Sequence, residues 1–105
     1  MIKISVLYPY QKNARFDHDY YRDTHLPLVS SFMGEGLRKF TIDKGISGGL
    51  PGTQPPYIGM CHLFCESFET FQKSFGPHAE KIYQDIGNYT DIAPVIQVSE
   101  VVEVN

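Results

Sequence analysis

The sequence predicts an α+β domain in which two helices cover one face of a four-stranded antiparallel sheet. Four segments have the alternating pattern of strands, and two have the periodicity of helices. The strand segments are residues 2–9, 37–46, 57–66 and 95–104, and the helical segments are 16–33 and 67–88. Their order, β-α-β-β-α-β, is a split β-α-β arrangement that places both helices on the same side of the sheet. With 105 residues, the chain is expected to form one domain over 1–105.

The first helix has clear start and stop signals. Asp17 is a good N-cap, because its carboxylate can accept hydrogen bonds from the amides of the first turn. Pro27 cannot donate an amide hydrogen and disfavours helical geometry at the residue before it. The first regular segment is therefore expected to stop or kink near His25, and the helix to resume until about Met33.

The second half of the chain gives similar signals. Residues 37–46 carry Lys and Arg side chains that suit an exposed edge strand. The segment 47–56 is rich in Gly and Pro, and is either a loop bordering a binding site or a simple surface loop. Ser67 is expected to cap a second helix that Gly76-Pro77 interrupts, and residues 95–104 should form the last strand.

Composition excludes several classes of protein. The chain is 42% hydrophobic and 20% charged, with a net charge of −3 and no basic run, so nucleic acid is not an expected partner. No segment approaches the ~20 apolar residues that span a bilayer, and residues 2–7 read as a strand rather than a signal peptide. We expect a cytoplasmic protein without a membrane partner, in which Cys61 and Cys65 are reduced thiols.

One face of the predicted sheet has no helix to cover it. Four strands of about seven residues present roughly 400 to 500 Å² of sheet, close to the largest apolar patch that monomers usually expose. The strands at 57–66 and 95–104 carry apolar residues on both faces. The sequence therefore predicts a homodimer in which two sheets pack face to face.

His25 is the candidate for acid-base chemistry. It follows Tyr21 by one helical turn on the same face and ends the segment before Pro27. An imidazole can move a proton near neutral pH, so His25 is a candidate catalytic residue. The alternative is structural: Tyr21, His25 and Phe32 follow the rhythm of a core-facing stripe, in which histidine is often a hydrogen-bonded filler.

Metal and cofactor motifs are missing from the sequence. The histidines at positions 18, 25, 62 and 78 form no HxxxH pattern, and the cysteines form no CxxC pattern. No glycine fingerprint for a nicotinamide or flavin is present. The sequence predicts no metal and no cofactor, so an oxidoreductase role would need carbanion chemistry on the substrate or a partner protein.

The run Phe16–Val29, with Tyr20-Tyr21 followed by His25-Leu26-Pro27-Leu28, resembles the EthD family of the dimeric α+β barrel superfamily, which has a ferredoxin-like fold. The strand order and the segment Phe64–Phe68 extend the likeness over nearly the whole chain. Many relatives carry Trp where this chain has Tyr21. The resemblance implies a homodimeric barrel with a small-molecule pocket beside the first helix, and a position for His25 as the proton-transfer group in that pocket.

These observations support three hypotheses. The first is a cofactor-independent enzyme, of a family often labelled oxidoreductase, that performs isomerase, decarboxylase or cyclase-type proton transfer on a small hydrophobic or aromatic metabolite. His25 would be catalytic, and the candidate substrate-binding residues are Tyr20, Tyr21, His62 and Phe64. The second is a non-catalytic dimeric carrier that serves an oxygenase degradation system. The third is a haem-binding relative. For His62 alone, the alternative to ligand binding is a structural role in the protein interior.

Overall fold

The computed structural model covers residues 1–105 and has the predicted order of elements. The strands are β1 (Ile2–Pro9), β2 (Lys39–Lys44), β3 (Tyr57–Cys65) and β4 (Val95–Glu100). The first helical region consists of α1 (His18–Tyr20), the π turn η1 (Tyr21–His25), α2 (Leu26–Met33) and the 3-10 turn η2 (Gly34–Gly36). The second consists of α3 (Phe68–Phe75), the 3-10 turn η3 (Gly76–His78), α4 (Ala79–Asp85) and the 3-10 turn η4 (Ile86–Asn88).

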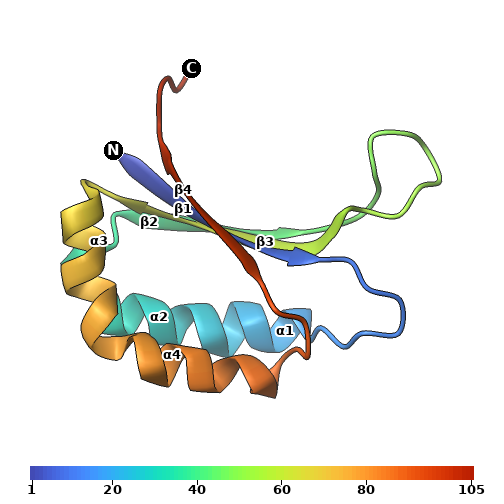
Figure 1. Ribbon diagram of the computed structural model, residues 1–105, viewed down its shortest axis with the longest axis horizontal. Helices are drawn as coiled ribbons and strands as arrows, with labels where there is room; N and C mark the ends of the chain where they lie inside the picture. Colours follow the sequence, from blue (N-terminus) through green and yellow to red (C-terminus); the bar gives the residue numbers. More distant parts are fainter.

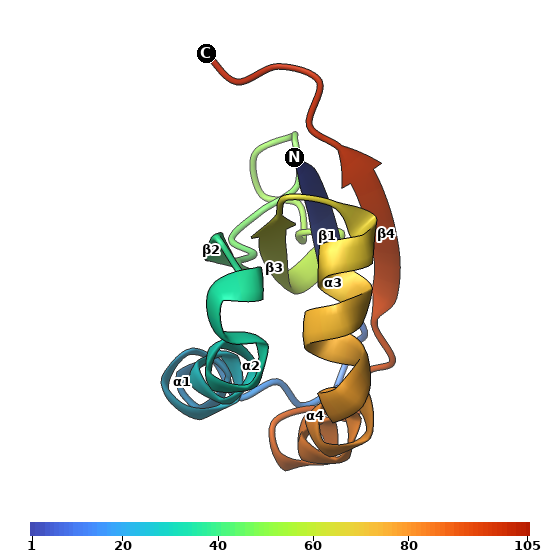
Figure 2. The same cartoon turned by 90° about the vertical axis from the view of Figure 1, so that its left-hand side faces the viewer.

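The four strands form one antiparallel sheet in the order β2-β3-β1-β4. Both helical regions lie on the same side of this sheet, and Figures 1 and 2 show the other side free of any helix. The predicted α+β fold, ferredoxin-like with two helices on one face, is confirmed.

Strand alternation sorts the residues of β3 between the two faces of the sheet. Cys61, Leu63 and Cys65 face the helices and are buried. His62 and Phe64 lie on the outer face, which no helix covers. This alternation decides which residues can reach a site between sheet and helices.

The outer face is less apolar than the sequence suggested. In the register of the sheet, Leu7 pairs with Met60 on one side and Val95 on the other, which forms one apolar row across three strands. The next row is polar, because Ser5 pairs there with His62 and Gln97. The apolar part of this face is therefore a stripe rather than a whole surface.

The first helical region runs through the predicted break without stopping. Asp17 caps it, since its carboxylate accepts a hydrogen bond from the Tyr20 amide at 3.0 Å. The amide of Leu26 donates to the carbonyl of Tyr21, five residues back, and so closes a wider π turn just before Pro27. The wider turn accommodates the proline, which lacks an amide hydrogen and whose ring would crowd a regular turn.

The second helical region follows the predicted signals. Ser67 caps α3 by accepting a hydrogen bond from the Thr70 amide at 3.1 Å. At Gly76 and Pro77 the α-helical winding changes to the tighter 3-10 turn η3, and α-helical winding begins again in α4. Phe71 and Phe75, one turn apart on α3, direct their rings toward the sheet and pack against the core.

Strands β2 and β4 are several residues shorter than predicted, and β3 is one residue shorter. Strand β4 stops at Glu100, which pairs with Ile2 at the start of β1. Strand β2 covers Lys39–Lys44 rather than 37–46, since Lys44 is the last residue that pairs with β3. Cys61 and Cys65 are both free and buried. No helix has both the length and the apolar character needed to cross a membrane.

Candidate functional site

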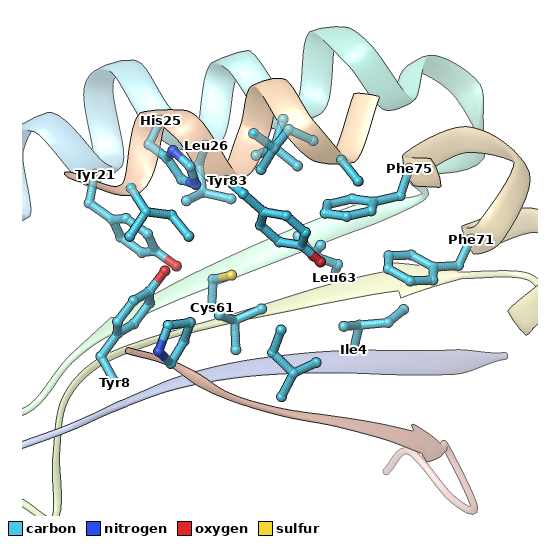
Figure 3. Close-up of a pocket in the computed structure, with 17 residues that line it drawn as sticks. Ile4, Tyr8, Tyr21, His25, Leu26, Cys61, Leu63, Phe71, Phe75 and Tyr83 are labelled. Carbon is cyan, nitrogen blue, oxygen red and sulfur yellow. The ribbon is translucent and has the colours of Figure 1, made fainter. Parts of the chain in front are cut away.

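A cavity of about 190 Å³ lies between the helices and the sheet. Fifteen of its seventeen lining residues are hydrophobic. At one end the hydroxyls of Tyr8 and Tyr21 point toward one another, near His25 and Cys61 (Figure 3). At the other end the walls are the rings of Phe71, Phe75 and Tyr83, and the Tyr83 hydroxyl lies beside Leu63 (Figure 3). The cavity thus has mostly apolar walls with a few polar groups, a common form for small-molecule sites.

His25 is the last residue of η1 and lies on the cavity wall, as the sequence-based hypothesis requires. The residue is only 5% exposed, and its Nδ1 lies 2.8 Å from Oδ2 of Asp85 on α4. Burial lowers the pKa of His25 below its ordinary value, and the hydrogen bond and charge of Asp85 offset this only in part. His25 is therefore neutral at pH 7.

Asp85 is held by three neighbours. Oδ1 of Asp85 accepts hydrogen bonds from the Tyr20 hydroxyl at 2.7 Å and the Asn88 side-chain amide at 2.9 Å. Burial raises the pKa of Asp85, but the hydrogen bonds from Tyr20, His25 and Asn88 outweigh it, so the net shift is downward. An ionised Asp85 accepts a hydrogen bond, so Nδ1 of His25 carries the proton and Nε2 is the acceptor.

Two tyrosines continue this network on the other side of the imidazole. Tyr89 lies just after η4, and its hydroxyl is 3.3 Å from Nε2 of His25. The same hydroxyl is 2.6 Å from the hydroxyl of Tyr8 on β1. With Nε2 as acceptor, Tyr89 donates to His25 and accepts from Tyr8. The result is a continuous chain of hydrogen bonds from the cavity to Asp85.

Tyr21 brings a hydroxyl to the cavity wall. Its ring stacks on that of His25, and its hydroxyl has the Tyr8 hydroxyl and the Cys61 thiol as hydrogen-bonding neighbours. Burial is the main cause that raises the pKa of Tyr21, so the hydroxyl stays protonated. Burial likewise raises the pKa of the neighbouring Cys61 thiol to about 11. The Tyr21 hydroxyl is thus a neutral donor on the cavity wall.

The predicted site residues lie in three different places. His25 and Tyr21 line the cavity, whereas Tyr20 lies outside it and hydrogen-bonds Asp85. His62 and Phe64 are on the outer face of the sheet, away from the cavity. There His62 bonds Ser5 through Nδ1 at 2.7 Å. Strand alternation separates His62 and Phe64 from His25, so the five predicted residues do not form one site.

Three residues of the site were missed from the sequence: Tyr8, Asp85 and Tyr89. Tyr8 is on the apolar face of β1, so the alternation of that strand could have placed it toward the helices. Asp85 precedes Tyr89 by four residues, but α4 ends between them, so helical spacing alone does not connect the two. Only the packing of the second helical region against the first reveals their contacts with His25.

Metal and haem binding have little structural basis here. No three His, Cys, Asp or Glu side chains lie close enough together to hold a metal ion. His25 is the single histidine on the cavity wall, and both of its ring nitrogens are already engaged, by Asp85 and Tyr89. The residues that line the cavity therefore do not fit the third hypothesis, a haem site.

Comparisons with known proteins identify the family. The EthD domain matches residues 13–93 of the chain. A crystal structure of an EthD-like protein from Ralstonia eutropha JMP134 is 45% identical, covers 99% of this chain and 94% of its own, and superposes with a TM-score of 0.95. No curated protein matches the chain.

Two more distant structures share the fold. An EthD family protein from Bacillus halodurans C-125 is 22% identical, with a TM-score of 0.66 and coverage of 95% of this chain and 97% of that one. A protein from Arabidopsis thaliana is 12% identical, with a TM-score of 0.70 and coverage of 100% and 99%. The match over residues 13–93 and the close likeness to the Ralstonia protein show that this chain belongs to the EthD family.

Proposed function

We propose that this protein is a cofactor-independent enzyme that moves a proton on a small, uncharged, hydrophobic or aromatic metabolite. The observation that carries the proposal is His25, a neutral imidazole held by an ionised Asp85 on the wall of an apolar cavity. An imidazole whose Nε2 is unprotonated at pH 7 can accept a proton, and the adjacent carboxylate stabilises the resulting imidazolium.

The cavity supports a neutral ligand of modest size. No Lys, Arg, Asp or Glu is among the lining residues, so a carboxylate or phosphate would lose its hydration without gaining a partner. A cavity of about 150 Å³ binds benzene in another protein, so 190 Å³ suits one or two fused rings. The Tyr21 hydroxyl would donate to one oxygen of such a molecule.

The reaction needs only proton transfer. His25 removes a proton from a carbon next to a carbonyl group, the C–H electrons form a carbon–carbon double bond, and the carbonyl electrons move to oxygen. The Tyr21 hydroxyl donates a hydrogen bond to this oxygen and stabilises its charge. Return of the proton to a different carbon gives an isomer, with no oxidant or reductant required.

A dimeric carrier protein is the second candidate. It is favoured by one observation: Nε2 of His25 already accepts a hydrogen bond from Tyr89, as expected of a satisfied structural histidine. A carrier would use the same cavity but would bind a ligand without changing it. The two functions differ only in whether bound molecules exchange protons with the protein.

Hydrogen exchange on β-tetralone, an uncharged bicyclic ketone with acidic C–H groups, tests the proposal. Proton NMR in heavy water measures deuterium uptake next to the carbonyl, and calorimetry measures binding. We expect uptake above the protein-free rate that falls about 100-fold in His25→Gln. The matched control His78→Gln, which removes a histidine outside the cavity, should keep the wild-type rate.

Each other outcome of this experiment contradicts part of the proposal. Binding of β-tetralone without exchange would overturn the enzyme in favour of the carrier. Undiminished exchange in a folded His25→Gln variant would remove His25 from the reaction. If neither binding nor exchange occurs, the proposed class of ligand is wrong.

We also infer a homodimer and a reducing compartment such as the cytoplasm. The apolar row of Val95, Leu7 and Met60 on the outer face supports the dimer, because a second copy of the sheet would cover it. The buried free thiols Cys61 and Cys65 support the compartment, since thiols persist where disulfides do not form.

A further inference from the structure

We propose that His25 exchanges protons with the substrate through Tyr89 and Tyr8, so that the hydroxyl of Tyr8 is the group that touches the reacting atom. This inference rests on the proposed function, because it assumes that His25 is the base. The two proposals differ in the path of the proton. Here the imidazole of His25 receives the proton through two hydroxyl groups, and not by direct contact with the substrate.

The position of Tyr89 is the first reason. Its hydroxyl is 3.3 Å from Nε2 of His25 and occupies the one nitrogen that could serve as a base. Tyr89 is fully buried, at 0% exposure, and is not among the residues that line the cavity. A substrate in the cavity would have to displace this buried hydroxyl to reach Nε2 directly, whereas Tyr8 already lines the cavity.

The direction of the hydrogen bonds is the second reason. Asp85 fixes the Nδ1 proton of His25, so Nε2 must accept and Tyr89 must donate to it. The Tyr89 oxygen then accepts from Tyr8, whose hydroxyl is 2.6 Å away. Because the only hydroxyl hydrogen of Tyr8 is donated to Tyr89, its remaining lone pair is the acceptor on the cavity side, where the Tyr21 hydroxyl is its present neighbour and a substrate proton would compete for it.

The proton balance follows from this order. The substrate C–H bond breaks and its proton bonds to the Tyr8 oxygen, while the Tyr8 hydrogen passes to the Tyr89 oxygen and the Tyr89 hydrogen passes to Nε2. His25 becomes an imidazolium beside the carboxylate of Asp85. The electron pair stays on the substrate, and the reverse sequence returns the proton.

The concerted order avoids a free phenolate. Burial raises the pKa of Tyr8 to about 12, and burial is also the largest cause that raises the pKa of Tyr89. Neither tyrosine can hold a negative charge for long in this apolar environment. Each oxygen gains one proton as it loses another, so the only charge that forms within the protein is on His25, where Asp85 compensates it.

Tyr21 complements this route. Its hydroxyl and that of Tyr8 point toward one another in the cavity, as Figure 3 shows. A substrate in the cavity beside this pair would present its oxygen to Tyr21 and its acidic C–H group to Tyr8. The 3.3 Å separation between Tyr89 and His25 is the longest step of the chain, and we expect it to shorten when a ligand binds.

The experiment compares three variants in the β-tetralone exchange assay. Tyr89→Phe removes the middle hydroxyl but keeps the ring, and Tyr8→Phe removes the one on the cavity wall. We expect both to reduce the exchange rate about 100-fold, close to the loss in His25→Gln. Tyr10→Phe, which removes an exposed hydroxyl outside the cavity, is the matched control and should keep the wild-type rate.

The outcomes separate this inference from the proposed function. Wild-type exchange in Tyr89→Phe or in Tyr8→Phe, with strong loss in His25→Gln, would overturn the route through the tyrosines and leave His25 as a direct base. Wild-type exchange in His25→Gln would instead overturn the proposed function itself.

A measurement on the wild-type protein avoids the risk that a variant fails to fold. Loss of deuterium from deuterated β-tetralone is followed in mixtures of light and heavy water. Of the three hydrogens that move together, those of Tyr8 and Tyr89 exchange with the solvent, and two such protons in flight give a curved dependence of rate on the deuterium fraction of the solvent. A rate that does not depend on this fraction, as expected for direct abstraction by His25, or that depends on it linearly, would overturn the relay.

Discussion

The rings of Tyr21 and His25 stack almost parallel, with centroids 5.5 Å apart and planes inclined by 12°. The two residues are the first and last of the π turn η1, so the turn itself holds them on the same side of the helix. This stacking places a phenol and a buried imidazole side by side on one wall of the cavity.

Tyr21→Phe should separate function from stability. The Tyr21 hydroxyl has only the Tyr8 hydroxyl and the weakly bonding Cys61 thiol as neighbours in the protein, so its removal should change the free energy of unfolding by about 1 kcal/mol at most. If the hydroxyl stabilises the substrate oxygen, exchange of β-tetralone should fall roughly 100-fold. Urea unfolding and the exchange assay measure the two effects. Full exchange in this variant would contradict the assigned role.

Asp85→Asn should impair catalysis by changing the imidazole. The variant removes the negative charge that stabilises the imidazolium, and we expect exchange to fall by about 100-fold or more. The charge of Asp85 also raises the pKa of His25, so the acid limb of the rate profile should move to lower pH. A profile of rate against pH checks this, with Asp91→Asn as a control carboxylate outside the site. An acid limb that moves to higher pH would be inconsistent with the assigned pair.

Protein stability should decrease as the pH falls below 6.5. Burial lowers the pKa of His25 in the folded state, so the unfolded chain binds a proton more readily over the interval between the two pKa values. The free energy of unfolding is therefore highest above pH 6.5 and falls until the folded-state pKa is passed. His18, whose pKa burial also lowers, adds a contribution of the same sign. Urea unfolding at several pH values measures the slope.

His25→Gln provides the comparison for this pH dependence. In this variant the free energy of unfolding should decrease less steeply as the pH falls below 6.5. The part of the decrease that remains is the contribution of His18. The same slope in His25→Gln and the wild-type protein would show that His25 does not cause it.

The proposed dimer can be disrupted at Met60. This residue lies on the outer face of the sheet, in the apolar row with Leu7 and Val95. A specific interface should bury at least about 1,000 Å², and a buried carboxylate without a partner opposes it. We expect Met60→Glu to be a folded monomer and Gln72→Glu, on an exposed part of α3, to stay dimeric. Light scattering at micromolar concentration measures both, and a monomeric wild-type protein would refute the dimer.

The fold could be predicted because its signals are local. Caps at Asp17 and Ser67 and the breaks at Pro27 and Gly76 act within a few residues. Strand alternation separated the two sets of β3 side chains but not which set meets the helices, because both sets are apolar. The π turn was not predicted, because the sequence shows only that Pro27 disturbs the helix. Whether the chain continues past such a disturbance depends on the packing around it.

The site could be predicted only in part, because its contacts are distant in sequence. His25 bonds to Asp85, 60 residues away, and Tyr8 bonds to Tyr89, 81 residues away. No spacing rule connects such residues before the helices are placed on the sheet. Tyr20 and Tyr21 show the same difficulty, since adjacent helical residues point in different directions and only Tyr21 reaches the cavity.

The π turn between Tyr21 and Leu26 lets this region accept a change in chain length. A π turn contains one residue more than the corresponding α turn, so it absorbs the extra residue and leaves the helix before and after it facing the same way. Deletion of one residue among positions 22–24 would restore regular winding with Tyr21 and Leu26 four residues apart, and both would still lie on the same side of the helix. In alignments of relatives, a single-residue gap in the middle of this helix would therefore mark a chain that lacks the π turn but whose site residues still face the cavity.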